Sequence, residues 1–206
     1  MDVFQAMAEM RAMRRLKPDP VPREEIEDVI RYATHAPSGS NSQGWRFVVV
    51  TDAEKRRRIG ELYRQSVDNY LATGNTKPLP HQTQEEWEAL VKAVRWQGDH
   101  VGEAPVIIFP CLKRSRRGLT HDVGSRGLGA SIYPAVQNIL LACRAKGLGA
   151  TLTTLHFAHE AEIDRLLGIP EDAATFAMIP VGYPMGKFGP TKRLPVDTVI
   201  GRDGWE

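Results

Sequence analysis

The order of helical and strand patterns along the chain constrains the fold more than any other feature. Two helical patterns precede the first strand: residues 2–15 start at Asp2 as an N-cap, and residues 22–33 carry a periodic apolar stripe. The first strand, at about 45–51, comes only afterwards. A regular doubly wound fold alternates strands and helices throughout. The order therefore predicts an α+β fold, with helices layered against a sheet, rather than a regular parallel sheet.

The remaining patterns are short and alternate irregularly. Thr83-Gln84-Glu85-Glu86 is a capping box that predicts a helix start, and Gly147 and Gly168 are C-cap glycines of two later helices. We expect helices at 52–67, 83–94, 130–145 and 160–167, strands at 105–110, 149–155 and 176–183, a loop at 72–82 and a polar surface excursion at 113–127. The length of 206 residues and the lack of repeats predict one domain over residues 1–206.

Composition argues against several classes of partner. Twenty-seven basic residues against 25 acidic ones give a formal net charge of +2, which argues against bulk electrostatic binding of nucleic acid. The two cysteines are too few for a disulfide framework and are expected to be reduced, which favours the cytoplasm. No apolar run reaches the roughly 18–20 residues of a membrane span, and no signal-peptide pattern is visible. We therefore expect a cytoplasmic protein without nucleic-acid or membrane partners.

Familiar catalytic motifs are missing from the sequence. There is no GxxxxGK[ST] phosphate loop and no GxSxG nucleophile elbow, and the glycines at 124–129 do not follow a strand as a dinucleotide-binding fingerprint must. His156 and His159 lie three residues apart without a third ligand nearby in sequence, so no metal site is predicted. These motifs assign no catalytic side chain.

Two polar stretches next to strands suggest contact with a flat polar ligand. The turn at 38–44, Ser-Gly-Ser-Asn-Ser-Gln-Gly, runs straight into the first apolar strand and offers small side chains together with donors and acceptors. Thr151, Thr153 and Thr154 crowd the end of a later strand. Strand propensity alone accounts for threonine there, and its hydroxyls also suit a polar heterocycle.

Two basic pairs form the third feature. Arg11 and Arg14 lie three residues apart on one face of the first predicted helix, and Lys192-Arg193 stand in the tail. Arginines at a helix C-terminus often only complement its dipole. Two separated basic pairs also suit a phosphate dianion, because each arginine offers a fork of N–H donors.

Five segments, taken in order, resemble the FMN-dependent nitroreductase superfamily and span nearly the whole chain. They are RAMRRLKPDPVP (residues 11–22), APSGSNSQGWRFVVV (36–50), ASIYPAVQNILLACRAKGLGATLTT (130–154), LLGIPEDAATFAMIPVGYP (166–184) and TKRLPVD (191–197). Each segment is weak alone, and the ordered set is specific. The Thr-Thr strand and the spacing from VGYP to KRxPxD look most similar to the branch that contains iodotyrosine deiodinase and related flavin reductases.

The resemblance implies an antiparallel-centred sheet flanked by helices, in an intertwined homodimer with two FMN sites at the subunit interface. It implies a lid-like segment at about 70–99 and a dimer-embracing tail at about 186–206. By this resemblance the phosphate and ribityl end of FMN contacts Arg11, Arg14, Lys192 and Arg193, and the isoalloxazine ring contacts Leu152, Thr153 and Thr154 of one chain and Ser38, Gly39, Asn41 and Gln43 of the partner. A hydroxyl or N–H of Thr153 or Thr154 would lie near N5 of the ring.

Two positions depart from the family pattern. Ala12 stands where the family has a serine after the first arginine, so a hydroxyl contact is lost while a backbone contact to FMN remains. Gly44 stands where the family has a proline, which loosens the start of the strand. Neither departure removes a charged or ring-facing residue of the expected site.

The resemblance predicts an FMN-dependent oxidoreductase. In a ping-pong cycle it would oxidise NADH or NADPH, release the nicotinamide, and then reduce a nitroaromatic, a quinone or a similar electron-poor aromatic acceptor. Flavin carries such chemistry, so the protein needs to bind and tune it rather than supply a nucleophile. Reductive dehalogenation, fragmentation of the flavin itself, and non-catalytic flavin storage remain alternatives.

Overall fold

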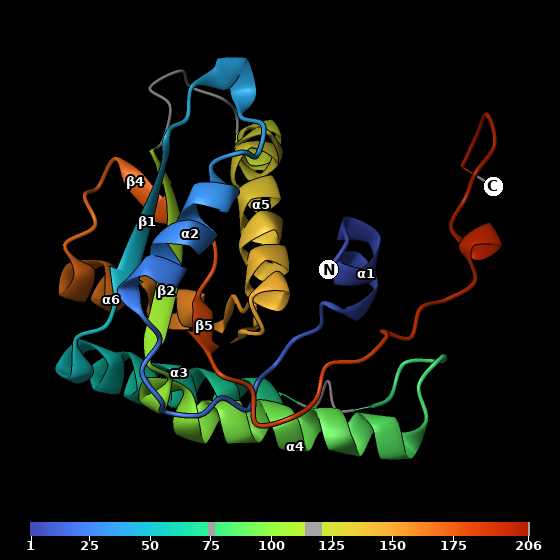
Figure 1. The fold of residues 1–206 in the computed structure, drawn as a ribbon, viewed down its shortest axis with the longest axis horizontal. Coiled ribbons are helices and arrows are strands. Elements are labelled where there is room, and N and C mark those ends of the chain that lie inside the picture. The colour runs from blue at the N-terminus through green and yellow to red at the C-terminus, as the bar shows by residue number, and fades with distance from the viewer. Residues whose placement is uncertain (74–76, 114–120, 206) are drawn as a thin grey trace.

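An antiparallel sheet forms the centre of the molecule, as predicted (Figure 1). The structure is a computed structural model that describes residues 1–73, 77–113 and 121–205, with the backbone alone for 121–126. The strands are β1 (Trp45–Val50), β2 (Val106–Lys113), β3 (Gly149–Ala150), β4 (Ala173–Thr175) and β5 (Ile179–Gly182). Their order is β1-β2-β5-β3, and β4 pairs with the C-terminal end of β2. Each of these pairings is antiparallel.

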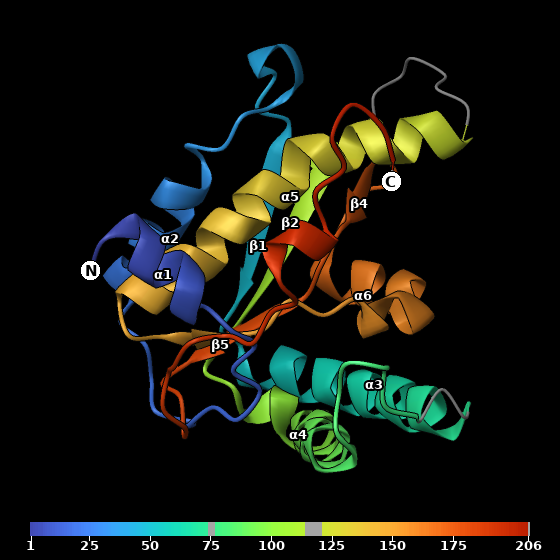
Figure 2. The same cartoon turned by 90° about the vertical axis from the view of Figure 1, so that its right-hand side faces the viewer.

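β2 lies at the centre because both of its faces are apolar. Ile108 points toward a layer formed by α2 (Arg23–Ala33) and α5 (His121–Ala145). Ile107 and Phe109 point toward the opposite layer, formed by α3 (Ala53–Ala72) and α6 (Glu160–Leu167). The split follows from the strand itself, whose successive side chains point to opposite faces. Two helical layers therefore enclose the sheet (Figure 2).

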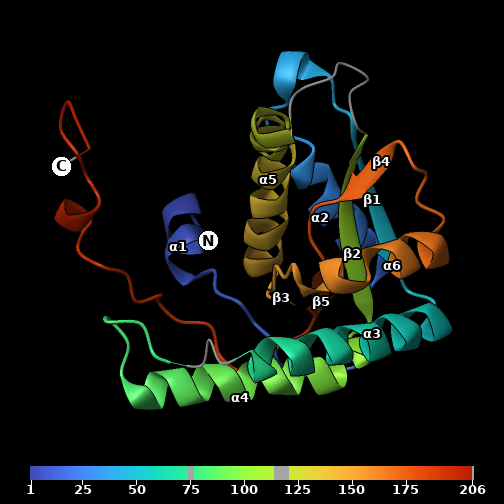
Figure 3. The same cartoon turned by 180° about the vertical axis from the view of Figure 1, so that it is seen from behind.

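Two more helices extend the structure beyond these layers. α4 (Gln84–His100) packs along α3, and the pair lies across one end of the sheet (Figure 3). Gly98 allows this close approach, since a Cβ there would lie 3.0 Å from Cγ1 of Val67. α1 (Val3–Glu9) and the C-terminal tail stand to one side of α5 (Figure 1). None of the helices among the described residues is long and apolar enough to cross a membrane.

Local sequence signals set several helix ends. Asp2 and Asp52 cap α1 and α3 through their side chains, and Thr83 and Glu86 form the predicted capping box of α4. Gly147 follows α5 with φ +75°, and Gly168 follows α6 with φ +68°. This left-handed conformation favours glycine. The caps predicted from sequence are confirmed.

Several predicted elements are wrong in extent, and three of them bear on the site. The first helix stops at Glu9 rather than near residue 15, because Met13 and Lys17 donate their backbone N–H groups to Ala150 and Tyr183 instead. α5 begins at His121, so much of the expected excursion at 113–127 is helical, and residues 114–120 lie outside the described part. The strand expected at 149–155 is two residues long, followed by an isolated bridge at Thr153.

Candidate functional site

An extended arm, residues 11–17, carries the first basic pair along the edge of the sheet. Met13 donates to the carbonyl of Ala150, and Arg15 accepts from the backbone of Met185 in the tail. The packing is close at Gly149, where a Cβ would lie 2.8 Å from Cδ2 of Leu16 and 3.0 Å from Cβ of Met13. Arg11 and Arg14 therefore do not share a helix face, and the helix-dipole explanation for them falls away.

Arg14 is the most unusual charge of the arm. Its side chain is half-buried, within electrostatic range of Tyr63 and Tyr70 on α3 and of Arg11. Burial lowers the pKa of its guanidinium. In the part of the chain that the structure describes, no carboxylate pairs with it. A half-buried guanidinium without a carboxylate is suited to bind an anion supplied from outside the chain.

The threonine-rich segment after β3 divides between two faces. Thr151 and Thr153 point inward, with 2% and 9% of their surface exposed, whereas Leu152 and Thr154 are exposed. Thr153 exchanges two backbone hydrogen bonds with Met178. Its hydroxyl lies 3.1 Å from the phenol oxygen of Tyr63 and accepts from the N–H of Leu155 at 3.3 Å. Leu152 and Thr154 therefore face outward, and Thr153 supports them from within.

A buried histidine anchors the chain just beyond this segment. His156 has no exposed surface, and its Nε2 lies 3.1 Å from the hydroxyl of Thr175 at the end of β4. Its ring meets Phe109 edge-on. Burial in these apolar surroundings lowers its pKa to about 4, so the imidazole is neutral at pH 7. Its ring therefore makes its contacts within the core, to Thr175 and Phe109.

The tail brings the second basic pair toward α4 rather than to Arg14. Thr191 donates through its backbone to the carbonyl of Ala8, which places the tail beside α1. The ammonium of Lys192 then pairs with Glu86 on α4, and the guanidinium of Arg193 donates to the carbonyl of Lys192. The tail therefore bridges the arm region and the helix predicted to be part of a lid.

The polar turn before β1 is preformed and exposed. Gly39–Asn41 form a short 3₁₀ turn in which Ser40 and Asn41 have φ +52°, and Gln43 has φ +48°. The hydroxyl of Ser38 accepts from the N–H of Gln43, and the amide of Gln43 donates to the side chain of Asn41. These internal bonds, together with one bond from Gly39 to Ser131 on α5, hold the backbone with its positive φ angles. The polar groups are presented to the outside.

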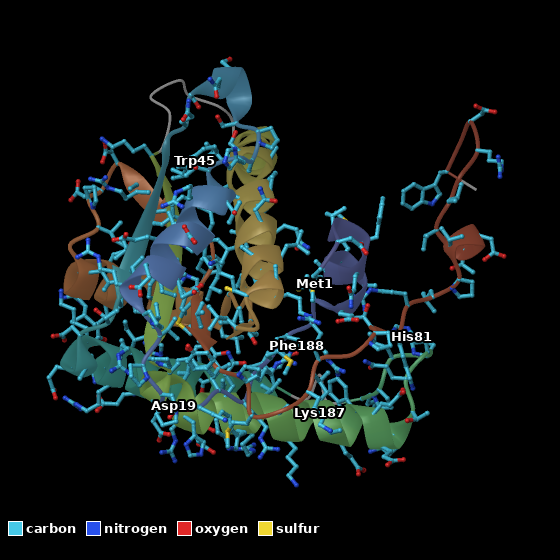
Figure 4. The ribbon with its side chains drawn as sticks, viewed as in Figure 1. Met1, Asp19, Trp45, His81, Lys187 and Phe188 are labelled. Carbon is cyan, nitrogen blue, oxygen red and sulfur yellow. The ribbon has the colours of Figure 1, made fainter. Side chains whose placement is uncertain are left out.

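Within one chain the predicted site residues fall into two groups at opposite ends of α5. The turn contacts the first half of α5, where the N–H of Gly39 donates to Ser131. The arm and the threonine segment lie beyond the other end of α5, at Ala150. At 1.5 Å per residue, Ser131 and Ala145 are roughly 20 Å apart along the helix. Figure 4 shows Trp45, next to the turn, far from Phe188 near the arm.

Two open cavities of about 530 and 540 Å³ lie elsewhere. One lies between α2 and β1, around Ile26, Ile30 and Phe47. The other lies between α1, α2 and α5. Neither is lined by a residue of the predicted site. Neither of these two cavities therefore joins the polar turn to the arm of the same chain.

The sequence model of the nitroreductase family matches residues 7–183. The chain belongs to the nitroreductase family. Its match covers the arm, the polar turn and the threonine segment. The fold confirms the α+β, nitroreductase-like architecture predicted from sequence.

Relatives in the family carry two kinds of description. Iodotyrosine deiodinase of Danio rerio is 29% identical over 84% of this chain and 57% of that protein. A putative NADH dehydrogenase/NAD(P)H nitroreductase of Methanothermobacter thermautotrophicus is 31% identical over 89% of this chain and 78% of that protein. The chain thus spans less than two thirds of the zebrafish deiodinase. The sequence similarity confirms that the chain lies near the deiodinase branch.

Solved structures show the same fold. A crystal structure of oxidized iodotyrosine deiodinase bound to FMN and 3-iodo-L-tyrosine is 24% identical, with a TM-score of 0.74 over 100% of both chains. A nitroreductase with bound FMN from Desulfitobacterium hafniense is 20% identical, with a TM-score of 0.69 over 98% of this chain and 99% of that one. At this identity the likeness concerns the fold alone.

Tyr63 is the site residue that the sequence analysis missed. It lies in the helix predicted at 52–67 and is 2% exposed. A tyrosine in a buried stripe is a signal of a buried polar partner, because its hydroxyl needs a hydrogen bond. The sequence offers no means of finding that the partner is Thr153, 90 residues away.

Proposed function

We propose that the chain is an FMN-dependent oxidoreductase that acts as a homodimer. The observation that carries the proposal is Arg14, a half-buried guanidinium without a carboxylate partner among the described residues. Tyr63 links it to the threonine segment, because Tyr63 interacts electrostatically with Arg14 and is hydrogen-bonded to Thr153. It suits the phosphate of a cofactor whose ring lies against the outward-facing Leu152 and Thr154. Membership of the nitroreductase family supports the assignment.

The donors available fit FMN when two chains are combined. In the proposed site, the phosphate and ribityl end of FMN is bound by Arg11, the backbone of Ala12, Arg14, Lys192 and Arg193. The ring lies against Leu152 and Thr154, with Thr153 behind them. Further ring contacts come from a second copy of the chain, through its Ser38, Gly39, Asn41 and Gln43. FMN, when bound, supplies the hydride and electron transfer for which the chain has no nucleophile. Lys192 must exchange its partner Glu86 for the phosphate.

Exposed apolar side chains on α1 and in the tail support the proposal that the chain forms a homodimer. Phe4 and Met7 on α1 are 78% and 52% exposed, and Val196 and Val199 in the tail are 68% and 69% exposed. Apolar side chains gathered on such extended elements mark an interface. We propose that the tail at 186–206 embraces the partner and that residues 70–99 form a lid within a single domain of residues 1–206.

The proposed reaction has two half-reactions in one pocket. NADH or NADPH is oxidised first and its nicotinamide leaves, and an aromatic acceptor such as a nitroaromatic or a quinone is reduced next. Polar groups of the ring-facing walls orient the ligands, and the lid excludes water. The buried, unpaired Cys111 and Cys143 are consistent with a cytoplasmic location.

Reductive dehalogenation is the second candidate. It is favoured by the similarity to the zebrafish deiodinase, 29% identical over 84% of this chain. Such a reaction uses the same reduced cofactor and replaces a carbon–halogen bond of an aromatic ring by carbon–hydrogen. Halide release distinguishes it from nitro or quinone reduction.

The decisive experiment begins with the purified protein and its absorption spectrum. A yellow flavin spectrum, bleached by anaerobic NADH or NADPH and restored by a nitroaromatic or a quinone, is expected. Incubation of the reduced protein with 3-iodotyrosine and measurement of iodide tests dehalogenation. A colourless protein that does not bind added FMN contradicts the proposal. Tight FMN binding without reduction by either nicotinamide favours storage, and loss of intact FMN during aerobic turnover favours flavin fragmentation.

A further inference from the structure

Tyr63 joins two parts of the candidate site that are far apart in sequence. It lies on α3, is 2% exposed, and packs in the core layer between α3 and the sheet. Its phenol oxygen lies 3.1 Å from the hydroxyl of Thr153. The positive charge of Arg14 acts electrostatically on the same phenol. Tyr63 is therefore hydrogen-bonded to the threonine segment and lies within electrostatic range of the basic arm.

Packing alone does not explain why residue 63 is a tyrosine rather than a phenylalanine. A phenylalanine fills nearly the same volume, and a buried hydroxyl is costly unless it is hydrogen-bonded. Burial raises the pKa of the phenol, which keeps it neutral. Ser66 is a useful contrast on the same helix: it is also buried, yet its hydroxyl bonds only to the carbonyl of Leu62 in α3 itself.

Thr153 is held from three directions. Its backbone pairs with Met178, its hydroxyl accepts from the N–H of Leu155, and the phenol of Tyr63 completes its hydrogen bonds. Because Thr153 points inward, its neighbours Leu152 and Thr154 point outward. Fixing the side chain of Thr153 thus fixes the direction of the two exposed residues.

We propose that Tyr63 is a positioning residue for the cofactor site: its hydrogen bond to Thr153 sets the outer face formed by Leu152 and Thr154. This inference rests on the proposed function. Tyr63 acts on the cofactor site through Thr153. A preset site binds more tightly because less ordering is left for the moment of binding.

The test compares Tyr63→Phe, Thr153→Val, Thr153→Ser and the double variant Tyr63→Phe/Thr153→Val, with Ser66→Ala as the matched loss of a buried hydroxyl on α3. FMN is removed from each protein, and the dissociation constant for FMN is measured from quenching of its fluorescence. Tyr63→Phe and Thr153→Val should each weaken FMN binding by roughly 5- to 20-fold, the range of one lost buried hydrogen bond. The double variant should bind FMN no more weakly than Thr153→Val alone, because Thr153→Val already removes the bond to Tyr63 together with the one from the N–H of Leu155. Thr153→Ser should keep wild-type affinity.

A second measurement does not depend on FMN. Backbone hydrogen exchange of residues 152–155 in the FMN-free protein should rise in Tyr63→Phe and stay unchanged in Ser66→Ala. Unchanged affinity and unchanged exchange in Tyr63→Phe would overturn the inference, as would fully additive effects of the two single changes. If the wild-type protein binds no FMN, the proposed function fails, and the exchange data still decide whether Tyr63 orders this segment.

Discussion

The two halves of the candidate site differ in how they are held. The arm and threonine half is built from three distant parts of the chain, and its central hydroxyls, on Tyr63 and Thr153, are buried and bonded to each other. The polar turn at 38–43 is exposed, and it is held by bonds among its own residues and one to Ser131. The first half depends on tertiary packing, and the second depends mainly on local geometry.

This difference teaches how the site is completed. The preformed turn contacts the first half of α5, away from the arm of its own chain, and under the proposed function it contributes to the site of a second copy. The arm half, in contrast, leaves the cation of Arg14 without a carboxylate in the described part of the chain. We infer that each half is ready before assembly and that a homodimer brings them together.

The largest expected effect comes from the arm half. Arg14→Ala should weaken FMN binding on the order of 100-fold, since hydrogen bonds to a charged group contribute about 1.5–3 kcal/mol each. Arg15→Ala is the control, because Arg15 is exposed and lies over the ring of Trp96. Dissociation constants are measured by fluorescence. Equal effects of the two changes would show that Arg14 acts only as general positive charge.

Mixing subunits tests whether the halves come from different chains. Arg14→Ala and the double variant Asn41→Ala/Gln43→Ala should each bind FMN poorly alone. After co-refolding of equal amounts, half of the dimers are mixed and each has one intact site of two, so about a quarter of all sites should bind FMN normally. FMN content per chain is the measurement. No recovery in a confirmed mixed dimer contradicts a shared site.

Acid should destabilise the folded chain through His156. Its pKa of about 4 in the folded chain lies below the ordinary value of 6.5, so the unfolded chain takes up the proton first. The contribution of His156 to the free energy of unfolding is therefore fully present above about pH 6.5. It decreases as the pH falls from 6.5 to 4 and does not change further below pH 4. The total loss is on the order of 3 kcal/mol.

The free energy of unfolding at several pH values measures this loss. His156→Gln should flatten the dependence, and His81→Gln, which changes an exposed histidine, should not. Parallel curves for the wild-type protein and His156→Gln would show that the buried imidazole does not govern acid stability.

The smallest effect is expected in the turn, at Gly44. A Cβ there meets only Cδ1 of Leu112 at 3.6 Å, so Gly44→Ala should change stability by less than about 1 kcal/mol. Gly44→Pro should destabilise by roughly 1–3 kcal/mol, because a proline drives the preceding residue to extended backbone while Gln43 has φ +48°. Thermal unfolding measures both. A stabilising proline would show that the conformation of Gln43 is dispensable.

Several parts of the molecule were predictable because their signals are local. The caps at Asp52 and Thr83 bond within their own helices, and Gly147 and Gly168 need only their own backbone conformation. The apolar run of β1 and the ordered family segments also rest on neighbouring residues. These signals were enough for the fold class and the family.

Other parts needed contacts between distant residues. The arm looked helical by its periodicity, and it is extended because the edge at Ala150 and Tyr183 supplies its hydrogen bonds. Three threonines looked alike in sequence, and only packing turned Thr153 inward to Tyr63 and left Thr154 outside.

The sequence alone thus determined the α+β class, the helix caps, the family and the set of polar residues available for a cofactor. The tertiary structure alone decided which of them meet: Arg14 with Tyr63, Tyr63 with Thr153, and the turn with neither. The physical reason is the distance along the chain over which each kind of interaction acts. Capping and periodicity act over a few residues, whereas a buried hydroxyl takes whichever partner the packing of the whole chain places beside it.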